Sequence, residues 1–587
     1  MRQPQTVRVE RDLPVEMRDG TVLYADLFRP EGDGRWPVLL QRTPYNKGLG
    51  GLALLQTDTF RAVARGYAVV IQDCRGRYAS DGAFAPFHQE VADGYDTVEW
   101  CARQPWADGG VGMYGTSYVG ATQWLAAVAA PPSLRCIVPT FTASDYYEGW
   151  TYQGGAFQWG FICNWVLPYL ASADLVRARE RGAISEADYA ASRDRLVAAV
   201  DGMDETVRTL PLGALPIYSE LSPYLAEWLA HPTRDEFWRS CAIEERHDRV
   251  QVPALNVGGW YDIFLDGTLR NFTGVRAHGT TAEARNGSRL LVGPWTHTTP
   301  PLAQSGAIDF GLSAGQGLSP LSMDVDGECL RFCDLWLKGI DDGLAAEPPV
   351  RLFVMGEGVW RGEETWPLER AQATEFFLRG NGEAGGALSP EGPGDDRPDV
   401  FLADPVHPVP TVGGQLCCYP SQLPPGAFDQ REVAARPDVL RYATTPLEED
   451  TEVTGPIRLH LWAATTAPDC DFTAKLVDIF PDGHARNLTD GVLRARYRLG
   501  TEAAHPIVPG EPTLYEIDLW ATSNRFRSGH RIGLEVASSN FPRFDRNPQT
   551  GGDSNNGDAA AELRPAMQTV FHDRERPSRL VLPIVPR

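Results

Sequence analysis

The N-terminal part of the chain alternates strand-like and helix-like patterns of hydrophobic residues. Hydrophobic and polar positions alternate over Val7–Val15 and again over Val22–Phe28, on either side of a turn at Asp19-Gly20, which predicts a β-hairpin. Short apolar runs then alternate with stretches of helical spacing: runs at 37–40, 67–71 and 111–114, and helical stretches at 57–64, 89–104 and 121–130. This rhythm predicts a parallel sheet covered by helices on both faces.

The pattern changes in the middle of the chain and again near residue 350. Residues 144–250 contain tryptophans and helical stretches at 171–181, 186–201 and 221–230, which predict a helical insertion. The strand–helix rhythm returns with strands at 254–257 and 289–292 and helices at 267–277 and 326–338. Beyond Val350 the pattern is almost entirely β with regular turn signals, which predicts a β-sandwich; examples are 350–355, 375–378, 456–464, 473–479, 513–519 and 531–537.

These patterns predict an α/β protein of three units. The first combines residues 1–144 and 241–349, the second is the helical insertion 145–240, and the third is the β-rich segment 350–587. A length of 587 residues and a hydrophobic content of 43% are ample for several cores.

Charge and composition exclude several classes of partner. The formal net charge is −23, with 54 Lys and Arg against 77 Asp and Glu, which argues against nucleic acid and against an anionic membrane surface. No apolar run approaches about 18 residues. The N-terminal residues 1–5 lack the apolar core of a signal peptide, so we expect a cytoplasmic protein. Its ten cysteines form no zinc-type pattern and are expected to be reduced.

One strand-to-helix junction has the sequence of a nucleophile elbow. The apolar run Val111–Tyr114 leads to Ser117, small residues flank it, and a helical stretch follows. Such a turn lifts a serine hydroxyl out of the backbone and offers free helix N–H groups to a developing oxyanion. Gly115 fits the G-x-S-x-G pattern, but Val119 stands at the second glycine position and Gly120 follows one residue later. A tight βα turn without catalytic function explains this segment equally well.

An acid and a base follow later strands in the order that the elbow requires. Asp262 comes shortly after the run 254–257, and His297 shortly after the run 289–292. Alone, Asp262 reads as a helix N-cap and His297 as a surface histidine. Together with Ser117 they predict a Ser–Asp–His triad. Tyr45 lies in a loop after the strand 38–40, where its hydroxyl could complete an oxyanion hole or simply pack.

At these residues the chain resembles a known family of serine hydrolases. The segment Gly115–Gly120 is similar to the G-x-S-Y-x-G elbow of cocaine esterase-like enzymes, α-amino-acid ester hydrolases, glutaryl acylases and X-Pro dipeptidyl-peptidases, which explains the late glycine. Further segments that resemble the family are Asp73–Gly76, Gly259–Asp262, Gly293–His297, Arg351–Gly356, Asp471–Asp478 and Ser538–Pro542. The resemblance covers nearly the whole chain. It implies an α/β-hydrolase domain with an inserted helical cap, followed by a C-terminal jelly-roll sandwich.

The resemblance also implies roles for individual residues. Ser117 would be the nucleophile, His297 the general base and Asp262 its orienter, while the Tyr45 hydroxyl and the Tyr118 backbone N–H would form the oxyanion hole. The implied reaction is ester hydrolysis through an acyl-enzyme, without a metal or an organic cofactor. The expected partner is a small-molecule ester or amide, and a homodimer is possible because relatives form dimers.

The resemblance further implies a substrate pocket between the three units. Trp150, Trp165 and Phe264 match aromatic pocket positions and would suit an aromatic or bulky acyl group, although cap tryptophans also pack helices. Cys417 and Cys418 stand where relatives have larger side chains, so two small thiols are expected to widen the pocket.

Alternative activities stay open at this point. An X-Pro dipeptidyl-peptidase, an amino-acid ester hydrolase or an acylase would hold a substrate ammonium with carboxylates. Asp145 and Glu148 are the candidates, but they also read as solvated surface acids. Two other hypotheses are a Ser-dependent acyl transferase and a non-catalytic carbohydrate-binding or scaffold protein, suggested by the β-sandwich and its aromatics.

Overall fold

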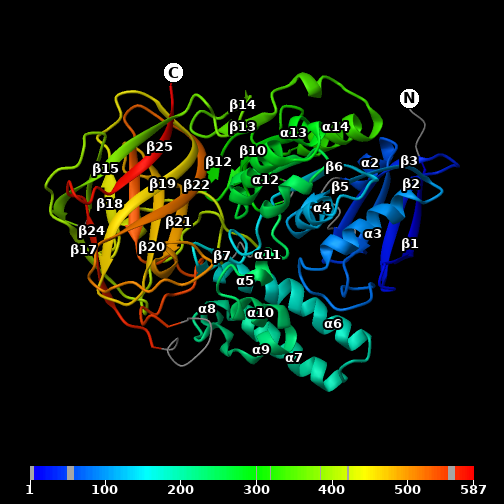
Figure 1. Ribbon diagram of the computed structural model, residues 1–587, viewed down its shortest axis with the longest axis horizontal. Helices are drawn as coiled ribbons and strands as arrows, with labels where there is room; N and C mark the ends of the chain where they lie inside the picture. The colour runs from blue at the N-terminus through cyan, green and yellow to red at the C-terminus, as the bar shows by residue number, and fades with distance from the viewer. Residues whose placement is uncertain are drawn as a thin grey trace.

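Figure 1 shows the protein, a computed structural model, as an α/β part, a layer of helices and a β-sandwich. The structure describes residues 6–48, 58–298, 301–317, 319–383, 385–418, 422–552 and 562–586. In the described part of the chain, no helix is long and apolar enough to cross a membrane.

A ten-stranded sheet forms the centre of the α/β part. Its strands are β1 (Val7–Glu16), β2 (Val22–Pro30), β3 (Trp36–Thr43), β4 (Ala68–Asp73), β5 (Ala107–Thr116), β6 (Leu134–Thr140), β9 (Leu255–Tyr261), β10 (Arg289–Thr296), β13 (Val350–Val354) and β14 (Val359–Glu363). Their order is β1-β2-β4-β3-β5-β6-β9-β10-β13-β14. The strands from β4 to β13 in this order pair in parallel, so their carboxyl ends share one edge of the sheet.

Helices cover both faces of this sheet, as the sequence pattern predicts. Leu40 of β3 packs in the same apolar core as α3 (Glu90–Ala102) and α4 (Tyr118–Val128), whereas its neighbour Leu39 packs with α2 (Thr59–Ala64) and α14 (Val325–Lys338). This alternation follows from the two-residue period of strand side chains. The other helices of this part are α12 (Leu265–His278), α13 (Ala282–Gly287) and the short 3₁₀ turns Glu244–Arg249 and Leu344–Ala346; a small hairpin joins β11 (Gln304–Ser305) and β12 (Ile308–Asp309).

The sequence-based boundaries differ from the structure at three places that matter for function. Strand β6 was not predicted, helix α4 begins at Tyr118 rather than at residue 121, and β9 and β10 continue to Tyr261 and Thr296. The predicted helix 57–64 begins within the described residues as α2, and its residue 57 lies outside them. The longer strands bring Asp262 and His297 directly to the strand ends.

A layer of short helices lies below the α/β part in Figure 1 and forms the cap. It contains β7 (Tyr152–Gln153), β8 (Ala156–Phe157), α5 (Trp159–Trp165), the π-helical turn η1 (Val166–Ala171), α6 (Ser172–Glu180), α7 (Glu186–Asp201), α8 (Met203–Thr206), the 3₁₀ turn Leu212–Ala214, α9 (Pro216–Leu221), α10 (Pro223–Ala230) and α11 (Glu236–Arg239). The predicted helical insertion is therefore present.

The C-terminal part is an all-β jelly-roll sandwich around its own apolar core. Its strands are β15 (Gln372–Glu383), β16 (Gly385–Ser389), β17 (Asp399–Ala403), β18 (Leu440–Ala443), β19 (Thr451–Thr465), β20 (Asp471–Ile479), β21 (Ala485–Arg494), β22 (Thr513–Phe526), β23 (Arg531–Ala537), β24 (Ala566–Phe571) and β25 (Arg579–Val585), with the short helix α15 (Arg431–Ala434) and the 3₁₀ turn Ala495–Tyr497. The assignment of all strands beyond Val350 to the sandwich was wrong for β13 and β14, because these two strands pair onto the edge of the first sheet.

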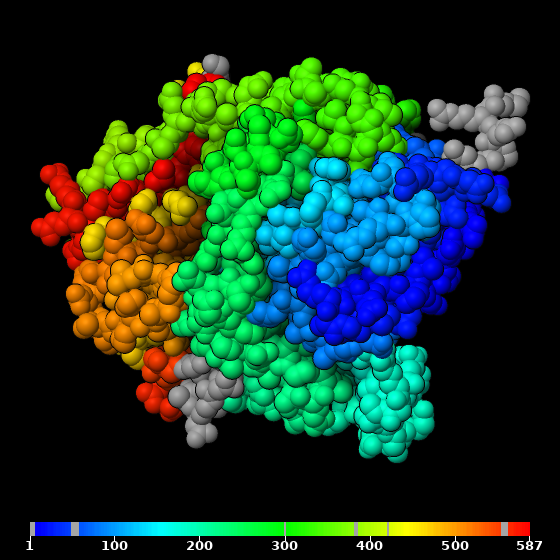
Figure 2. Space-filling view, turned by 45° about the vertical axis from the view of Figure 1, so that its right-hand side comes forward, coloured from blue at the N-terminus to red at the C-terminus, as the bar shows by residue number. Residues whose placement is uncertain are grey.

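The three parts pack against one another. Figure 2 shows the green chain after the cap lying between the blue N-terminal region and the orange strands of the sandwich, with the cap below both. Hydrogen bonds join the β7–β8 hairpin of the cap to the sandwich. The Arg494 N–H donates to the Gly154 carbonyl over 2.8 Å, and the Phe157 N–H donates to Asp545 over 2.8 Å.

Candidate active site

Ser117 lies at the tight turn between β5 and α4. Its backbone has φ of 63° and ψ of −125°, a conformation that non-glycine residues rarely adopt. Its N–H donates to the Thr140 carbonyl over 2.9 Å, which ties the turn to β6. Strain of this kind concentrates at functional sites, and this turn holds the hydroxyl away from the backbone.

The glycine at position 120 has a packing reason. A Cβ added to Gly120 would lie 2.7 Å from Thr142 Cβ and 3.2 Å from the Thr140 carbonyl oxygen. The first turn of α4 therefore crosses the end of β6 closely at residue 120. At residue 119 a valine side chain is accommodated in the core.

His297 and Asp262 form a hydrogen-bonded pair at the ends of adjacent strands. His297 Nδ1 and Asp262 Oδ1 are 2.6 Å apart, and Asp262 is fully buried. A carboxylate only accepts hydrogen bonds, so Nδ1 is the donor, and in the neutral imidazole Nε2 keeps its lone pair. The other oxygen of Asp262 accepts the Phe264 N–H over 3.2 Å, which fixes the carboxylate in place.

Ser117 and His297 lie on the same edge of the sheet. Strands β5, β6, β9 and β10 are neighbours in that order, and Phe141, directly after β6, has its ring centre 6.0 Å from that of His297. Among the described residues, no hydrogen bond joins the Ser117 hydroxyl to the imidazole. In enzymes without substrate this contact is often long and tightens in the complex. The sequence analysis missed Phe141 because it did not predict β6, although Cys136-Ile137-Val138 is a short apolar run.

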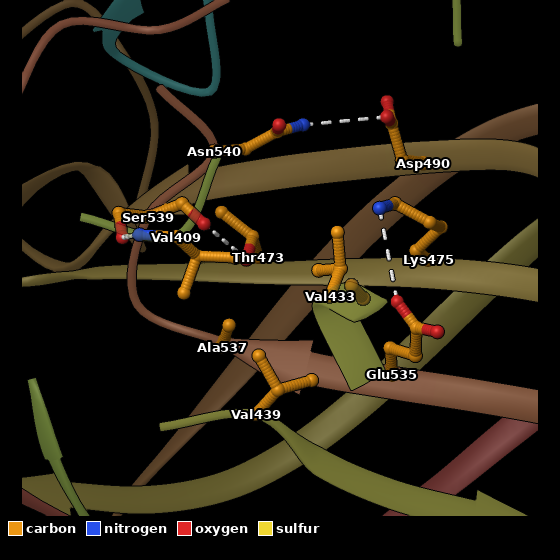
Figure 3. A pocket seen from close by; sticks show the side chains of 11 residues that line it. Val409, Val433, Val439, Thr473, Lys475, Asp490, Glu535, Ala537, Ser539 and Asn540 are labelled. Atoms are coloured by element: carbon orange, nitrogen blue, oxygen red, sulfur yellow. Dashed lines mark hydrogen bonds and ion pairs between the residues drawn. The ribbon is translucent and has the colours of Figure 1, made fainter. Parts of the chain in front are cut away.

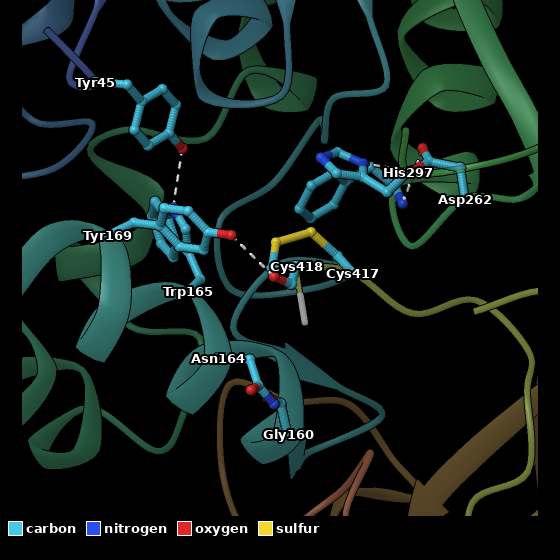
Figure 4. Close-up of a disulfide and its surroundings, with 10 residues drawn as sticks. Tyr45, Gly160, Asn164, Trp165, Tyr169, Asp262, His297, Cys417 and Cys418 are labelled. Atoms are coloured by element: carbon cyan, nitrogen blue, oxygen red, sulfur yellow. Dashed lines mark hydrogen bonds and ion pairs between the residues drawn. A yellow bond between two sulfur atoms is a disulfide. The ribbon is translucent and has the colours of Figure 1, made fainter. Parts of the chain in front are cut away.

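The Tyr45 hydroxyl accepts a hydrogen bond from the cap. Trp165 Nε1 donates to it over 2.9 Å, as Figure 4 shows. Burial raises the pKa of Tyr45 well above its ordinary value, so the hydroxyl keeps its proton. Within the described residues, that proton has no acceptor. The Lys47 N–H, which donates to Asp73 over 2.7 Å, anchors the loop that carries Tyr45.

Tyr118 has a backbone N–H at the site that is free within the described residues, whereas its side chain is engaged elsewhere. It is the first residue of α4, so its N–H has no acceptor within the helix, and none is found elsewhere in the described part of the chain. Its hydroxyl points away, because it donates to Glu90 over 3.1 Å and accepts the Phe87 N–H over 3.0 Å.

The three predicted pocket aromatics form one buried cluster that reaches the histidine. Trp150 stacks on Phe264 at 4.2 Å, its ring centre is 5.3 Å from Trp165, and Phe264 meets His297 edge-on at 5.1 Å. The cluster continues through residues that the sequence analysis did not single out, namely Phe87, Tyr146, Phe161 and Trp228. The sequence feature that could have indicated these residues is the density of aromatic residues in and around the cap.

Cys417 and Cys418 are joined by a disulfide, which corrects the expectation of two separate reduced thiols. The backbone of Cys418 has a φ of 83° in this pair. Cys417 is buried in the same apolar cluster as Trp150 and Trp165, and Cys418 packs against it. The other eight cysteines are free and buried. Tyr419, which follows the pair, lies outside the described residues.

Asp145 and Glu148 are both engaged with protein groups. Asp145 accepts Arg234 Nε over 2.6 Å and the N–H groups of Tyr147 and Glu148. Glu148 accepts the Gly154 N–H, and burial raises its pKa to about 8. Burial likewise raises the pKa of Asp145 to about 6. Asp145 is thus paired with Arg234, and Glu148 holds the turn of the β7–β8 hairpin.

Other polar clusters in the described residues do not form a comparable site. No group of three His, Cys, Asp or Glu side chains there could hold a metal ion. A cavity of about 20 Å³ in the sandwich has room for about one water molecule. Its charged groups are paired, since Lys475 Nζ lies 3.7 Å from Glu535 and Asn540 donates to Asp490, as Figure 3 shows.

Comparisons with known proteins cover the whole chain. Residues 19–299 match the model of the X-Pro dipeptidyl-peptidase (S15) family, and residues 342–581 match the X-Pro dipeptidyl-peptidase C-terminal non-catalytic domain. Cocaine esterase of Rhodococcus sp. (strain MB1 Bresler) is 39% identical over 587 residues, which cover 99% of both chains. A putative serine esterase of Mycobacterium bovis is 28% identical and covers 97% of this chain and 94% of its own length.

Solved structures share the fold. An aminopeptidase of a marine sediment Thaumarchaeota archaeon superposes with a TM-score of 0.78 and 27% identity, covering 99% of this chain and 97% of that chain. An α-amino-acid ester hydrolase has a TM-score of 0.78 at 24% identity over the same shares, which is a likeness of fold. The elbow, the His–Asp pair and these full-length matches agree, and the chain belongs to the X-Pro dipeptidyl-peptidase (S15) family of serine hydrolases.

Proposed function

We propose that the protein hydrolyses carboxylic esters, with Ser117 as nucleophile, His297 as general base and Asp262 as the residue that orients the base. The observation that carries this proposal is the 2.6 Å hydrogen bond between His297 Nδ1 and Asp262, on the sheet edge where Ser117 adopts a positive φ. The full-length similarity to an esterase at 39% identity supports esters as the substrate class.

The reaction proceeds through an acyl-enzyme. His297 Nε2 takes the Ser117 proton as the serine oxygen attacks the ester carbonyl, and the resulting imidazolium is stabilised by Asp262. The same proton then passes to the leaving alcohol. Water, deprotonated by His297, attacks the acyl-enzyme and releases the acid and Ser117.

Tyr45 and Tyr118 supply the oxyanion hole in this proposal. The Tyr45 hydroxyl has a proton to donate, and the Tyr118 N–H has no other acceptor among the described residues. Donors that are already oriented in a buried site stabilise the tetrahedral oxyanion without reorganisation.

The acyl group is proposed to be aromatic or bulky and apolar. Trp150, Trp165 and Phe264 are buried and reach His297 as one cluster, and Cys417 and Cys418 add their disulfide beside it. Aromatic surfaces of this kind favour large apolar groups.

Amino-ester hydrolysis or dipeptidyl-peptidase activity is the second candidate. The family and its archaeal aminopeptidase relative favour it. Against it, Asp145 is paired with Arg234, and Glu148 has a pKa raised to about 8 by burial. The cytoplasmic location and the homodimer stay predictions, which cell fractionation and sedimentation would test.

A substrate panel tests the proposal. Wild type and Ser117→Ala would be compared on p-nitrophenyl acetate, butyrate and benzoate, phenylglycine methyl ester and Gly-Pro-p-nitroanilide. We expect ester turnover that falls by at least about 10⁴-fold in the variant, together with fluorophosphonate labelling of the wild type alone. Preference for the free-amine substrates would favour the second candidate, and a wild type without turnover or labelling would refute catalysis.

A further inference from the structure

The Cys417–Cys418 disulfide lies beside the candidate active site. Figure 4 shows it between the cap residues Trp165 and Tyr169 and the pair formed by His297 and Asp262. Cys417 is 2% exposed, whereas Cys418 is only partly buried. Cys418 is therefore the more accessible half of the disulfide for a small thiol.

The disulfide constrains the backbone at this position. Bonding between neighbouring residues closes a small ring that includes the peptide bond between them, and Cys418 has a φ of 83°. A non-glycine residue rarely adopts this conformation without a constraint. Reduction opens the ring and allows Cys418 to return to negative φ, which moves its side chain and its carbonyl group.

The Cys418 carbonyl contacts the part of the cap that carries Trp165. The Tyr169 hydroxyl donates to this carbonyl over 3.2 Å. Tyr169 belongs to the π-helical turn η1, which starts directly after Trp165. Trp165 in turn donates to the Tyr45 hydroxyl over 2.9 Å. A displacement of the Cys418 carbonyl can thus move Tyr169 and, four residues earlier in the chain, Trp165. We call the side of the acyl site that Trp165 forms the acyl wall.

We propose that the Cys417–Cys418 disulfide is a redox-reactive site, and that its reduction by a thiol changes the acyl-group selectivity of the neighbouring centre through the contact with Tyr169. The proposal rests on the ester hydrolysis proposed above. In the disulfide form the acyl wall is preformed and favours large aromatic acyl groups. In the dithiol form the wall is mobile and that preference is lost.

The redox step consumes two thiols. A thiolate attacks Cys418 Sγ, the bond between the two cysteine sulfurs breaks, and Cys417 leaves as a thiolate that takes up a proton. A second thiolate attacks the external sulfur of the mixed disulfide, and Cys418 leaves as a thiolate that is protonated in turn. The products are two cysteine thiols and one external disulfide, so electrons and atoms balance.

Thiol counting tests whether the disulfide forms. The protein is denatured in iodoacetamide with and without prior dithiothreitol, and the alkylated cysteines are counted by mass spectrometry. Eight alkylated cysteines without reductant and all ten with it are expected. Ten alkylated cysteines without reductant, in protein prepared under air, would overturn the proposal.

A selectivity measurement tests whether reduction of the disulfide changes the preference for the acyl group. The ratio of kcat/KM for p-nitrophenyl benzoate to that for p-nitrophenyl acetate is measured before and after reduction. We expect reduction to lower this ratio by about tenfold. Cys418→Ala, which cannot form the disulfide, should show the low ratio without reductant and no response to it. An unchanged ratio in reduced wild type, with ten thiols counted, would overturn the proposal.

A cap variant, Tyr169→Phe, tests whether selectivity depends on the Tyr169–Cys418 hydrogen bond rather than on a general effect of the reductant. Tyr169→Phe keeps the disulfide but removes the donor to the Cys418 carbonyl; because the Tyr169 side chain is 45% exposed, the change leaves the core intact. It should lower the ratio while eight cysteines still alkylate. A ratio equal to that of wild type would refute the route through Tyr169. Loss of Ser117 labelling in both redox states would instead count against the proposed esterase.

Discussion

At the scale of single residues, the Tyr45 hydroxyl is the group whose chemistry depends most on its neighbour. Trp165 donates to it over 2.9 Å and so occupies one lone pair of the hydroxyl oxygen. The proton must then point elsewhere, and no described residue accepts it. Trp165 thereby acts as a positioning residue for an oxyanion donor, in addition to its place in the aromatic cluster.

A double-mutant cycle measures this coupling. On p-nitrophenyl acetate, we expect Tyr45→Phe to lower kcat by about 10²-fold because the oxyanion loses a donor. Trp165→Phe should lower kcat by about tenfold in wild type and by less than about twofold in the Tyr45→Phe background, because it acts through that hydroxyl.

Trp150→Phe is the matched control for the cycle. Trp150 is buried in the same cluster, but its indole N–H has no partner in the described residues. Its effect should therefore be the same in both Tyr45 backgrounds. Equal costs of Trp165→Phe in the two backgrounds would show that Trp165 contributes packing alone.

At the scale of elements, the junction of β5 and α4 sets the position of both the nucleophile and an oxyanion donor. The helix begins at Tyr118, immediately after Ser117, and it crosses β6 so closely that residue 120 has no room for a Cβ. This crossing explains the shifted glycine that departs from the G-x-S-x-G pattern.

Gly120→Ala tests the crossing. The added Cβ would lie 2.7 Å from Thr142 Cβ, so α4 must move away from β6. We expect a loss of about 1–3 kcal/mol of stability from overpacking and a fall in kcat of at least about tenfold. Gly392→Ala is the control, because its added Cβ meets no atom within 4 Å. Thermal melts and ester kinetics of both variants decide the outcome, and a fully active Gly120→Ala variant would contradict it.

At the scale of the whole molecule, Glu148 lies where the three parts meet. It accepts the Gly154 N–H at the turn of the β7–β8 hairpin, and the Gly154 carbonyl accepts a hydrogen bond from Arg494 of the sandwich. Arg270 and Asp266 of α12 face it as well, and burial raises its pKa from 4.5 to about 8.

Glu148→Gln should remove the loss of folding stability that the ionisation of Glu148 causes at high pH. Between about pH 4.5 and 8 the folded protein holds a proton on Glu148 that the unfolded chain has lost, so stability falls as pH rises. Glutamine still accepts the Gly154 N–H and carries no charge. We expect similar melting temperatures for variant and wild type at pH 5, and a variant that melts about 2–4 °C higher at pH 9. A difference that does not change with pH would contradict the raised pKa.

The prediction of the fold from sequence was most accurate where periodicity is strong. The hairpin of β1 and β2 and the helix Glu186–Asp201 agree with the structure because their patterns are local. Strand β6 was missed because its apolar run is short, and β13 and β14 were assigned to the wrong sheet. Strand pairing depends on residues that are distant in sequence, so a β pattern shows that a strand forms but not which sheet it joins.

By itself, the sequence determined the alternation of strands and helices, the elbow with Ser117, and the positions of Asp262 and His297 after apolar strands, because each of these depends on residues close together in the chain. Only the tertiary structure decided the 2.6 Å contact of His297 with Asp262, the hydrogen bond from Trp165 to Tyr45, and the disulfide beside them. The first two join segments separated by 35 and 120 residues. Cys417 and Cys418 are neighbours in sequence, but the local pattern does not show that they pair, and the positive φ at Cys418 appears only in the folded chain.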